Sequence, residues 1–503
     1  MNAPVAPAYE VAIVGFGPVG ACLANLLGLL GVRTLILDRE GPAYHLPRAV
    51  HFDDEIMRVL QTVGIADEMA HWVHVNPGMR FVGPDGTLLL DWPRPPGLSA
   101  QGWHPSYRFH QPDLERLLRE ALTRFDCVEV ATRCDVTSVV DEGRHVTVQF
   151  DDLETGQAQQ AVARYAVGCD GARSFVRDVI GSGIEDFGFH ERWLVVDVLL
   201  KQAKPELGDF SIQHCDAFRP ATYVRGTGNR RRWEITVRDD EDSAEVATPE
   251  GTWRLLLRWL TPAEADLERT AVYTFHSVVA ERWRQGRVLI AGDAAHQTPP
   301  FMGQGLCAGI RDAAKLAWKL AVCVNQEEPD GLLDSYQAER HAHVAAYVDM
   351  SLKLGRLINM DDPKQALEAG FPRPDGATKM TSITPRLGDG LSAGDREHAG
   401  RLAPQLRIGG DGRLDDASGY RSVLVSDRAI LHAAGLTRET VVAAGAHVVI
   451  VDDEPNGAAY VNELSARAVM IRPDRYILGT ANSAQELREL HATVAALATE
   501  RAT

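Results

Sequence analysis

Three glycines near the start of the sequence have the spacing of a dinucleotide-binding loop. Gly15, Gly17 and Gly20 fit the pattern GxGxxG, directly after the apolar residues 11–14 and at the start of a stretch rich in Ala and Leu. Glycine at these positions allows a tight turn and close approach of the backbone to a pyrophosphate, which then faces a helix N-terminus. Asp38 ends the next predicted strand, where a carboxylate can accept hydrogen bonds from ribose hydroxyls. The pattern predicts a dinucleotide site rather than a merely tight glycine turn.

A second segment, residues 287–305, indicates that the dinucleotide carries a flavin. A predicted strand ends just before Gly292 and Asp293, and the turn 303–305 (Gly-Gln-Gly) begins a long predicted helix. An aspartate at the end of a strand can bind a polyol chain, and free backbone N–H groups at a helix N-terminus stabilise negative charge. Because reduced flavin is an anion, this segment favours a flavin dinucleotide.

These motifs resemble those of the single-component (group A) flavoprotein aromatic hydroxylases, the family of p-hydroxybenzoate hydroxylase and phenol hydroxylase. The resemblance covers about residues 9–350 and is carried by GFGPVG at 15–20, DGARSFVR at 170–177 and GDAAHQTPPFMGQG at 292–305. Four further segments are most similar to 3-(3-hydroxyphenyl)propionate hydroxylases and 2-hydroxybiphenyl 3-monooxygenases: PRAVHFDDE at 47–55, RFHQPDLE at 108–115, GQGLCAGIRDA at 303–313 and IRPDRYILG at 471–479. Polyketide hydroxylases share the same layout.

The resemblance implies that FAD is the bound cofactor. The first motif, with Asp38 and Arg39, would hold its ADP half. In the family, the motif at 170–177 serves FAD and also the transient docking of NADPH or NADH. The implied cofactor-binding positions are Gly15, Gly17, Gly20, Asp38, Arg39, Arg48, Gln111, Val136, Asp170, Arg177, Gly292, Asp293, Pro300, Gly303, Gly305 and Leu306.

Only one dinucleotide motif is visible in the sequence, so NADPH or NADH is expected to dock briefly, reduce the flavin and leave. The resemblance implies that reduced flavin then reacts with O2 to a flavin hydroperoxide, which hydroxylates a phenolic ring next to an existing hydroxyl. A 3-hydroxyphenylpropionate-like substrate is favoured. The alternatives are a polyketide or biaryl phenol hydroxylase, which a wide apolar cavity without arginine would favour, a flavoprotein dehydrogenase, and a flavin-binding redox sensor without turnover.

His51 is the candidate base for the substrate hydroxyl. A phenol reacts best as its phenolate, and a histidine near Arg48 titrates in the useful range and could lie close to the flavin. In the 2-hydroxybiphenyl relatives the matching histidine is assigned this role. Asp53 could orient His51; the alternatives are a hydrogen-bonded structural histidine and a helix-cap aspartate. Candidates for the substrate face, which core packing explains equally well, are Tyr107, Gln213, Tyr223 and Trp233.

The composition limits the kinds of partner that the protein is expected to bind. The 503 residues include 52 lysines and arginines against 69 acidic residues, so the net charge of −17 disfavours nucleic acid and anionic membrane surfaces. The one basic run, residues 230–232, is interpreted as a solvated turn, with a carboxylate-attracting rim as the alternative. His296 is interpreted as a structural histidine. The seven cysteines form no CxxC pair and no Cys/His cluster has zinc spacing, so neither disulfides nor a metal is expected. With no signal peptide expected either, a cytoplasmic enzyme acting on a small aromatic molecule is predicted, with a homodimer as the assembly considered.

The helices and strands expected around these residues indicate an α/β protein with three domains. A Rossmann-type FAD-binding domain of the p-hydroxybenzoate hydroxylase type is expected over 1–186 and 266–358, with a β-rich substrate-binding domain over 187–265. Residues 359–403, rich in Pro, Gly and charge without periodicity, would link them to a thioredoxin-like domain over 404–503. No cysteine follows Cys323, so this last domain cannot perform dithiol exchange, and packing or subunit contact is its expected role.

Overall fold

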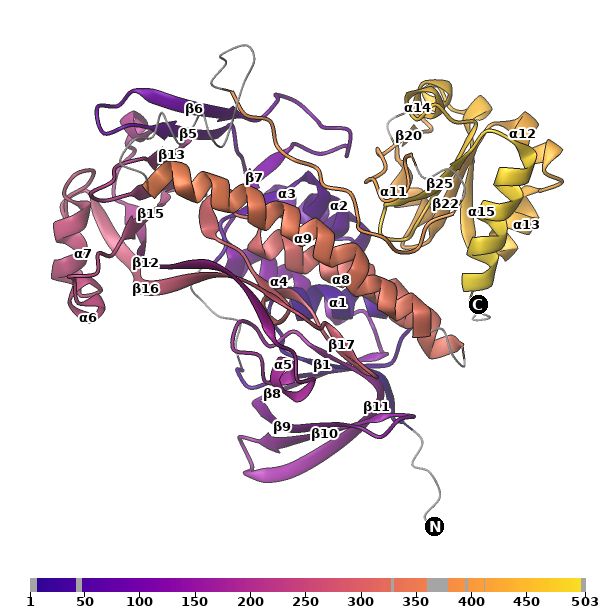
Figure 1. The fold of residues 1–503 in the computed structure, drawn as a ribbon, viewed down its shortest axis with the longest axis horizontal. Coiled ribbons are helices and arrows are strands. Elements are labelled where there is room, and N and C mark those ends of the chain that lie inside the picture. Colours follow the sequence, from indigo (N-terminus) through magenta and orange to yellow (C-terminus); the bar gives the residue numbers. More distant parts are fainter. Residues whose placement is uncertain are drawn as a thin grey trace.

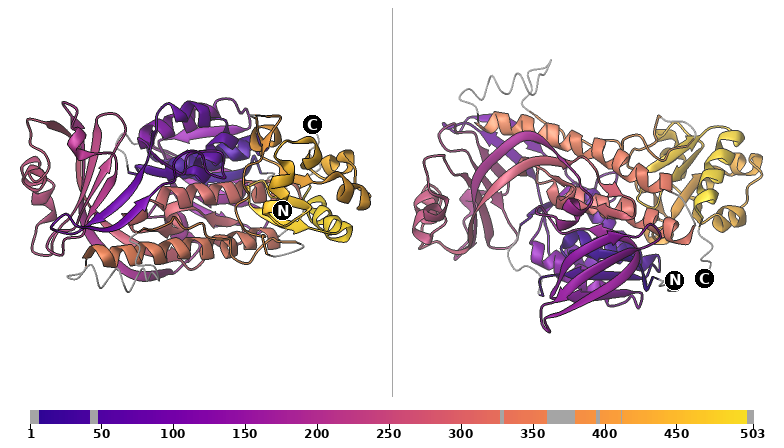
Figure 2. Two further views of the ribbon diagram at one scale, coloured as in Figure 1. Left: turned by 90° about the horizontal axis from the view of Figure 1, so that it is seen from above. Right: turned by 60° about the horizontal axis from the view of Figure 1, so that its bottom comes forward.

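The computed structural model describes residues 7–41, 48–326, 330–359, 379–393, 397–410 and 412–498. Figure 1 shows an elongated molecule in which a large central part lies between a sheet at one end and a small α/β domain at the other. In both views of Figure 2, helix α9 (Asp330–Asn359) runs along the central part from the end sheet towards the small domain. The predicted connecting segment 359–403 lies partly outside the described residues.

A parallel sheet forms the core of the central part, as the apolar run at 11–14 predicts. Its strand order is β17-β18-β11-β1-β2-β8, and β9 and β10 continue from β11 as an antiparallel ribbon. Neighbours from β18 to β8 run parallel, and β1 and β2 are buried almost throughout, which is typical of parallel strands. The strands are β1 (Tyr9–Val14), β2 (Thr34–Asp38), β8 (Val128–Thr132), β9 (Cys134–Asp141), β10 (Val146–Asp152), β11 (Gln157–Gly168), β17 (Arg284–Gln285) and β18 (Val288–Ile290).

Two helices that follow glycine motifs pack against each other beside this sheet. Helix α1 begins at Pro18, within the first glycine motif, and α8 begins at Gly305 and is buried from Cys307 to Val324. The long helix predicted at the second glycine motif is therefore confirmed. The helices of the central part besides α9 are α1 (Pro18–Leu29), α2 (Asp54–Val63), α3 (Ala66–Ala70), α4 (Gln111–Leu122), α5 (Phe175–Val179) and α8 (Gly305–Asn325).

The end sheet has eight strands in the order β19-β16-β12-β15-β14-β13-β5-β6. It extends beyond the predicted range 187–265, because β13 pairs in parallel with β5 and so brings residues 78–93 into the sheet. Helices α6 (Ser243–Val246) and α7 (Pro249–Leu256) pack on one face. The strands are β5 (Gly78–Val82), β6 (Leu88–Pro93), β12 (Ile184–Leu200), β13 (Ser211–His214), β14 (Ala221–Arg225), β15 (Arg230–Thr236), β16 (Ala265–Ala280) and β19 (His296–Gln297).

The basic run at 230–232 lies in β15, so its interpretation as a solvated turn is wrong. Arg231 and Arg232 are buried. Arg232 donates from Nε and Nη2 to the carboxylate of Asp197 on the neighbouring strand β12, at 2.7 and 3.0 Å. This carboxylate compensates the buried charge and comes from a distant part of the sequence, which the local pattern could not show.

The C-terminal domain contains a four-stranded sheet in the order β23-β22-β24-β25. Strands β22 and β23 are parallel, whereas β24 and β25 are antiparallel to their neighbours. Alternate residues of these strands enter two separate hydrophobic clusters, one on each face. The thioredoxin-like character of this domain stays a prediction. Its elements are β22 (Ser422–Ser426), β23 (Ala446–Ile450), β24 (Ala468–Ile471), β25 (Ile477–Ala481), α11 (Leu414–Ser418), α12 (Arg428–Ala433), α13 (Arg438–Ala443), α14 (Gly457–Glu463) and α15 (Ala484–Leu497).

Two further kinds of site are absent from the described part of the chain. None of its helices combines the length and the apolar character that a membrane span requires. Within the same residues, no three His, Cys, Asp or Glu side chains come together as metal ligands would. All seven cysteines are free thiols.

Candidate active site

The glycine loop at 15–20 is packed tightly except at its middle glycine. A Cβ on Gly15, whose φ is +107°, would lie 2.4 Å from the carbonyl oxygen of Cys169, and one on Gly20 would lie 2.1 Å from that of Gly15. A Cβ on Gly17 would meet no atom within 4 Å. Gly15 and Gly20 therefore permit the close approach of strand, loop and helix, whereas Gly17 borders open space at the N-terminus of α1, where a pyrophosphate fits.

Asp38 holds this loop from the end of β2. One of its carboxylate oxygens accepts the backbone N–H of Phe16, and the other accepts that of Glu40 at 2.7 Å. Arg39 is exposed and forms an ion pair with Glu40 at 3.5 Å. The predicted ribose acceptor thus lies beside the glycine loop, and its position is fixed by backbone donors on both oxygens.

Gln111, the first residue of α4, holds the segment that carries Arg48. Its Oε1 accepts the backbone N–H groups of Arg48 and Ala49 at 3.1 and 2.7 Å, and its Nε2 donates to Glu115 at 2.7 Å. The geometry therefore gives Gln111 a positioning role, while the side chain of Arg48 is exposed. Val136 lies half-buried on β9.

The motif at 170–177 is tied to the motif at 292–305. Asp170 accepts a hydrogen bond from the Ser174 hydroxyl at 2.6 Å, which shapes the turn before α5. Arg177 is buried and donates to the backbone carbonyl of Ala294 at 3.2 Å. The Arg177 contact joins the two segments, which follow the neighbouring strands β11 and β18.

Asp312 on α8 anchors the start of the 292–305 motif. Its Oδ2 accepts from the backbone N–H of Gly292 at 3.0 Å and from His296 Nε2 at 2.6 Å, and its Oδ1 accepts from Arg340 at 2.7 Å. His296 is buried in this network, which confirms a structural role. Asp293 remains exposed, although desolvation by the surrounding protein raises its pKa. Asp293 therefore combines an exposed carboxylate with surroundings that partly desolvate it.

The N-terminus of α8 offers a second set of backbone donors. Gln304 precedes the helix and makes no side-chain capping hydrogen bond, so the first N–H groups of α8, around Gly305 and Leu306, are available to a ligand. Pro300 begins the short 3₁₀ turn (Pro300–Met302) that leads to this point. With an open glycine loop at one end and a helix N-terminus at the other, the residues present fit FAD.

His51 forms the centre of a buried chain of hydrogen bonds beside Gly303. Its Nδ1 lies 3.2 Å from the carbonyl oxygen of Gly303, and its Nε2 lies 2.8 Å from the hydroxyl of Ser106. The Ser106 hydroxyl in turn accepts from Nδ2 of Asn76 at 2.7 Å. β3 (His51–Asp53) and β7 (Ser106–Arg108) carry these residues and pair in a small sheet with β4 (His74–Val75).

The hydrogen bonds of Asp53 lead away from His51. Its Oδ1 caps α2 by accepting the N–H of Ile56 at 3.2 Å, and its Oδ2 accepts from Arg311 at 2.5 Å and from Gln304 at 3.2 Å. The contacts of Asp53 are therefore those of a helix-cap aspartate, the alternative interpretation. The groups that orient His51 are Ser106 and Gly303, and the sequence did not indicate Ser106 because it is brought there by strand pairing.

A cavity lies between Gly303 and the end sheet. Its volume is about 40 Å³. His51 and Gly303 form the wall on the flavin side, and the end sheet contributes the opposite wall. The wall also includes the apolar side chains Met79, Trp92 and Phe301 and the charged side chains Arg94, Arg108 and Glu234.

Arg108 brings a buried positive charge to this cavity. Its side chain donates to the Ser211 hydroxyl, while its Nε has no hydrogen-bond partner among the described residues. Burial and the neighbouring Arg94 lower its pKa to about 9. A buried guanidinium with a free donor is suited to bind an anionic oxygen of a ligand. Sequence reasoning singled out the segment 108–115 but not this residue.

One of the four predicted substrate residues lines the cavity, and it is Gln213. Tyr223 and Trp233 pack together in a hydrophobic cluster on the opposite face of the same strands, because neighbouring side chains alternate between the faces of a sheet. Tyr107 is buried on β7, where its hydroxyl accepts a backbone N–H at 2.7 Å.

Comparison with known proteins identifies the class. A family model described as "FAD binding domain" matches residues 8–351. The chain is 37% identical over 513 residues to a "Probable NADH-specific resorcinol 4-hydroxylase" of Rhodococcus jostii (strain RHA1), with 97% of this chain and 96% of that protein covered. It is 33% identical over 521 residues to a "3-(3-hydroxy-phenyl)propionate/3-hydroxycinnamic acid hydroxylase" of Burkholderia cenocepacia (strain HI2424), with 94% of each covered. The chain therefore belongs to the FAD-binding-domain family and, within it, to the FAD-dependent aromatic hydroxylases, which are monooxygenases.

Solved structures share the fold over almost the whole chain. The flavin-dependent monooxygenase PieE, in complex with FAD and substrate, has a TM-score of 0.81 at 19% identity and covers 98% of this chain and 99% of its own. Aklavinone-11 hydroxylase, in a ternary complex with FAD and aklavinone, has a TM-score of 0.81 at 22% identity and covers 99% of this chain and 100% of its own. These likenesses confirm the predicted FAD-binding monooxygenase fold.

Proposed function

We propose that this enzyme hydroxylates a phenol that carries a second, oxygen-bearing substituent in the meta position, and that it does so next to the existing hydroxyl. A 3-(3-hydroxyphenyl)alkanoate is the favoured substrate. The relative from B. cenocepacia is named for such a compound, and the relative from R. jostii is named for resorcinol. Both are phenols with their second group in the meta position, and C4 of resorcinol is next to a hydroxyl.

The observation that carries this proposal is the buried guanidinium of Arg108 in the cavity wall. Its Nε is free to donate, and Arg94 adds a second positive charge nearby. A carboxylate or phenolate oxygen in the cavity would satisfy that donor and offset both charges. The alternative of a polyketide or biaryl hydroxylase predicts a wide apolar cavity without arginine, so the charges support the smaller, anionic substrate.

We further propose that His51 accepts the proton of the substrate hydroxyl at Nε2. Burial, with Arg108 and Arg94 next in effect, holds the pKa of His51 well below its usual 6.5, so the imidazole is neutral and able to accept. Because Ser106 already donates to Nε2 at 2.8 Å, the substrate hydroxyl must replace Ser106 at this atom. Asp53 acts on His51 only indirectly, through Gln304 and the backbone of Gly303.

Bound FAD, reduced by NADH, would supply the oxygen chemistry of the reaction. The residues of this chain bind and orient: the loop 15–20 and the N-terminus of α8 hold the two ends of the cofactor, and the cavity positions the phenol against Gly303. The apolar wall around Trp92 and Phe301 excludes water from the reacting groups. We propose NADH rather than NADPH as the reductant, because the relative that matches 97% of the chain is named NADH-specific.

Resorcinol is the second candidate substrate, favoured by the 37% identity to the R. jostii relative over nearly the full chain. Its second hydroxyl is smaller than a propionate and would meet the same charged wall. Glu234, whose pKa is raised mainly by burial, could exchange a hydrogen bond with that hydroxyl. The two candidates differ in charge, and this difference makes them separable by experiment.

The test is stopped-flow flavin absorbance with NADH and with NADPH, in the presence of 3-(3-hydroxyphenyl)propionate, resorcinol, m-cresol or 2-hydroxybiphenyl. We expect a meta-substituted phenol with an oxygen-bearing group to accelerate flavin reduction and to be recovered with one added oxygen next to its hydroxyl. Acceleration by 2-hydroxybiphenyl alone would favour the biaryl alternative. Anaerobic turnover with another donor, and no oxygenated product from any phenol, would instead indicate a dehydrogenase.

A further inference from the structure

A hairpin turn of the C-terminal domain contacts helices of the FAD-binding part. The turn joins β24 to β25, and its residue Asp474 accepts a hydrogen bond from the indole of Trp318 on α8 at 3.1 Å. Arg472 donates to the carboxylate of Glu339 on α9 at 2.8 Å. Tyr476 donates from its hydroxyl to Glu55 on α2 at 2.8 Å. The turn is therefore part of the interior of the molecule.

Arg475, within this turn, has a backbone conformation that side chains rarely adopt. Its φ is +69°, which costs a non-glycine residue about 1–2 kcal/mol. The surrounding structure maintains it, since the guanidinium lies 3.3 Å from Asp415 and donates to Ser418 at 3.2 Å and to Thr62 of α2 at 3.4 Å. A strained residue that is held in this way indicates a turn whose position matters for function.

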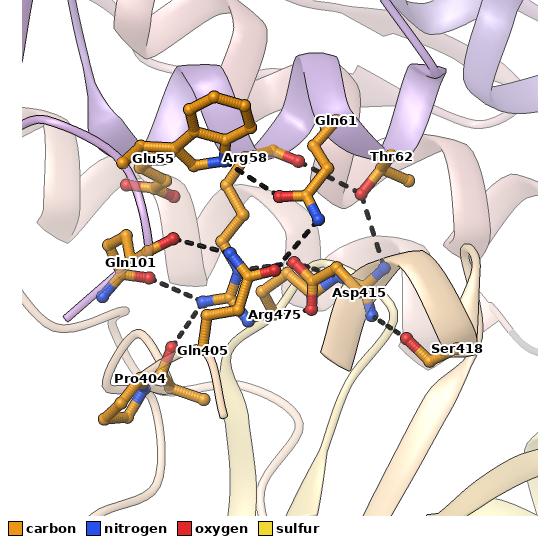
Figure 3. Close-up of polar contacts among 12 residues, drawn as sticks. Glu55, Arg58, Gln61, Thr62, Gln101, Pro404, Gln405, Asp415, Ser418 and Arg475 are labelled. Atoms are coloured by element: carbon orange, nitrogen blue, oxygen red, sulfur yellow. Dashed lines mark hydrogen bonds and ion pairs between the residues drawn. The ribbon is translucent and has the colours of Figure 1, made fainter. Parts of the chain in front are cut away.

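Helix α2 is bound to the C-terminal domain by several side-chain hydrogen bonds and an ion pair. Figure 3 shows Arg58, Gln61 and Thr62 of α2 directed towards residues 404–418 and 475. Arg58 donates to the two carboxylate oxygens of Asp415 at 2.5 and 3.0 Å, and both side chains are almost fully buried. Arg58 also donates to Gln101 at 2.6 Å. The position of α2 therefore depends on the C-terminal domain.

From Tyr476 a continuous chain of contacts reaches the 303–305 turn at the start of α8. Glu55, which accepts from Tyr476, also accepts from Nε of Arg311 on α8 at 2.5 Å. Arg311 donates from Nη1 to Oε1 of Gln304 at 3.0 Å and from Nη2 to Asp53 at 2.5 Å. Gln304 stands between Gly303, whose carbonyl holds His51, and the first residue of α8.

We propose that the C-terminal domain completes the flavin site, and that Tyr476 is a positioning residue which fixes the 303–305 turn through Glu55, Arg311 and Gln304. The domain thus has a role in addition to packing. This inference concerns the flavin end of the site, which the FAD-binding family establishes, and it does not depend on the substrate proposed above. Either proposal can fail without the other.

Burial makes each link of this chain sensitive to change. Tyr476 is 1% exposed, Glu55 8%, Arg311 2% and Gln304 7%. Water therefore cannot easily replace a lost partner, and removal of the Tyr476 hydroxyl leaves a buried carboxylate oxygen with one donor fewer. Arg311 would then be free to shift towards the remaining acids, and Gln304 would lose its fixed position.

The first test compares Tyr476→Phe with Tyr460→Phe in the full-length chain. Tyr460 lies in the same domain and donates its hydroxyl to the carbonyl of Pro404 at 3.2 Å, away from the chain to the flavin. Both variants lose one buried hydroxyl and keep the ring. The Kd for FAD, measured by fluorescence titration of the flavin-free protein, should rise about tenfold for Tyr476→Phe and less than twofold for Tyr460→Phe. The visible spectrum of bound flavin should shift for Tyr476→Phe alone.

The second test asks whether Tyr476 acts through Gln304. In a cycle of Tyr476→Phe, Gln304→Leu and the double variant, the changes in FAD affinity should be strongly non-additive if the two residues belong to one chain of contacts. Glu55→Gln breaks the same chain at the next link, should weaken FAD similarly, and serves in place of Tyr476→Phe if that variant does not fold. Additive effects, or an unchanged FAD affinity and spectrum in a folded Tyr476→Phe or Glu55→Gln variant, would overturn the proposal and leave the contact purely structural.

Discussion

The hydroxyl of Ser106 lies 2.8 Å from Nε2 of His51, and the direction of this hydrogen bond follows from the other ring nitrogen. The carbonyl of Gly303, 3.2 Å from Nδ1, can only accept. Nδ1 therefore carries the hydrogen of the neutral imidazole, and Nε2 accepts from Ser106. Asn76 donates to Ser106 and completes the chain. In this arrangement the proposed proton acceptor, Nε2 of His51, is already oriented, and the Ser106 hydroxyl is bonded to it before a substrate arrives.

The first prediction concerns the pH dependence of hydroxylation. Only neutral His51 can accept a proton, and because its folded pKa lies below 6.5, the acid limb of the rate should also lie below pH 6.5. A donor at Nε2 stabilises the neutral imidazole of the substrate-free enzyme, so Ser106→Ala should raise the pKa of His51 there and move the acid limb of kcat/KM to higher pH. Product formation measured from pH 5 to 8 shows this shift.

The rate of flavin reduction in the same samples is the control for this experiment, since it does not require His51. His51→Ala should keep FAD bound and slow hydroxylation about 100-fold or more. If the acid limb stays in place in Ser106→Ala, His51 is not the group that titrates. Full-rate hydroxylation by His51→Ala would remove it from the mechanism altogether.

Replacement of Arg108 should separate charged from neutral substrates. Arg108→Met removes the free Nε donor from the cavity wall, so the Kd for 3-(3-hydroxyphenyl)propionate should rise about 10- to 100-fold, as expected for a lost hydrogen bond to a charged group. The Kd for m-cresol should change less than threefold. Binding is measured by the change in flavin absorbance at pH 8, where His51 is neutral with or without Arg108.

The matched control is Arg231→Met, which removes another buried arginine of the same region. Arg231 lies on β15 and donates to the carbonyl of Gly228 at 3.0 Å, and it does not belong to the cavity wall. Its removal should leave the ratio of the two dissociation constants unchanged. Equal loss of both ligands in Arg108→Met would mean that Arg108 supports the cavity without binding the substituent.

Gly303 should not tolerate a side chain. Its φ is +63°, and a Cβ there would lie 3.1 Å from Nδ1 of His51 and 3.2 Å from its Cβ. Gly303→Ala should therefore displace His51 and lower hydroxylation more than flavin reduction. The control is Gly31→Ala: φ at Gly31 is +66°, but a Cβ there meets no atom within 4 Å.

Both alanine variants share the conformational cost of a positive φ, about 1 kcal/mol in the free energy of unfolding. Although both variants should lose about the same stability, only Gly303→Ala should also lose hydroxylation activity. The two effects are read from urea unfolding and from product formation on the same preparations. Comparable hydroxylation in the two variants would show that the position of His51 beside Gly303 is not important for the reaction.

Local signals in the sequence were sufficient to predict the loops and helices at the proposed cofactor end of the site. The glycines at 15–20 and the turn at 303–305 act through backbone geometry within a few residues, so their spacing predicts both the loops and the helices that follow. The substrate end arises differently. Ser106 reaches His51 only because β7 pairs with β3, and β5 joins the end sheet only because it pairs with β13. Such pairings leave no periodic pattern in either segment.

For Tyr223 and Trp233, the sequence predicted the correct strands of the substrate site but the wrong face of the sheet. Tyr223 and Trp233 are next to Thr222 and Glu234, which line the cavity. Because side chains alternate along a strand, a shift of one residue exchanges the buried cluster for the cavity. The role proposed for Tyr476 could not be predicted, because its partner Glu55 is on a different domain and their contact depends on how the domains pack.

The last prediction concerns Lys315, a buried amine on α8 close to this domain contact. Its Nζ has no hydrogen-bond partner among the described residues and lies 3.5 Å from the centre of the Tyr476 ring. Burial lowers its pKa from 10.5 to about 7, although Asp474 and Glu55 partly oppose the shift. Between pH 7 and pH 10.5, Lys315 therefore carries a proton in the unfolded chain but not in the folded chain.

Stability should therefore rise with pH from about 7 to about 10, by an amount of order 4 kcal/mol for this group alone. Below about pH 7 Lys315 is protonated in the folded chain as well, so it no longer contributes to the pH dependence of the free energy of unfolding. Lys315→Met removes the titrating amine, so the free energy of unfolding should depend less on pH in this window, and the variant should be more stable than wild type near pH 7.

Urea unfolding at pH 7, 8, 9 and 10, followed by tryptophan fluorescence, measures this slope. Lys353→Met is the control, because Lys353 lies half-exposed on α9, where its ammonium contacts Asp349 at 2.9 Å. It should leave the slope as in wild type. Identical slopes in wild type and Lys315→Met would mean that the amine stays protonated in the folded chain, stabilised by the acids and the Tyr476 ring around it.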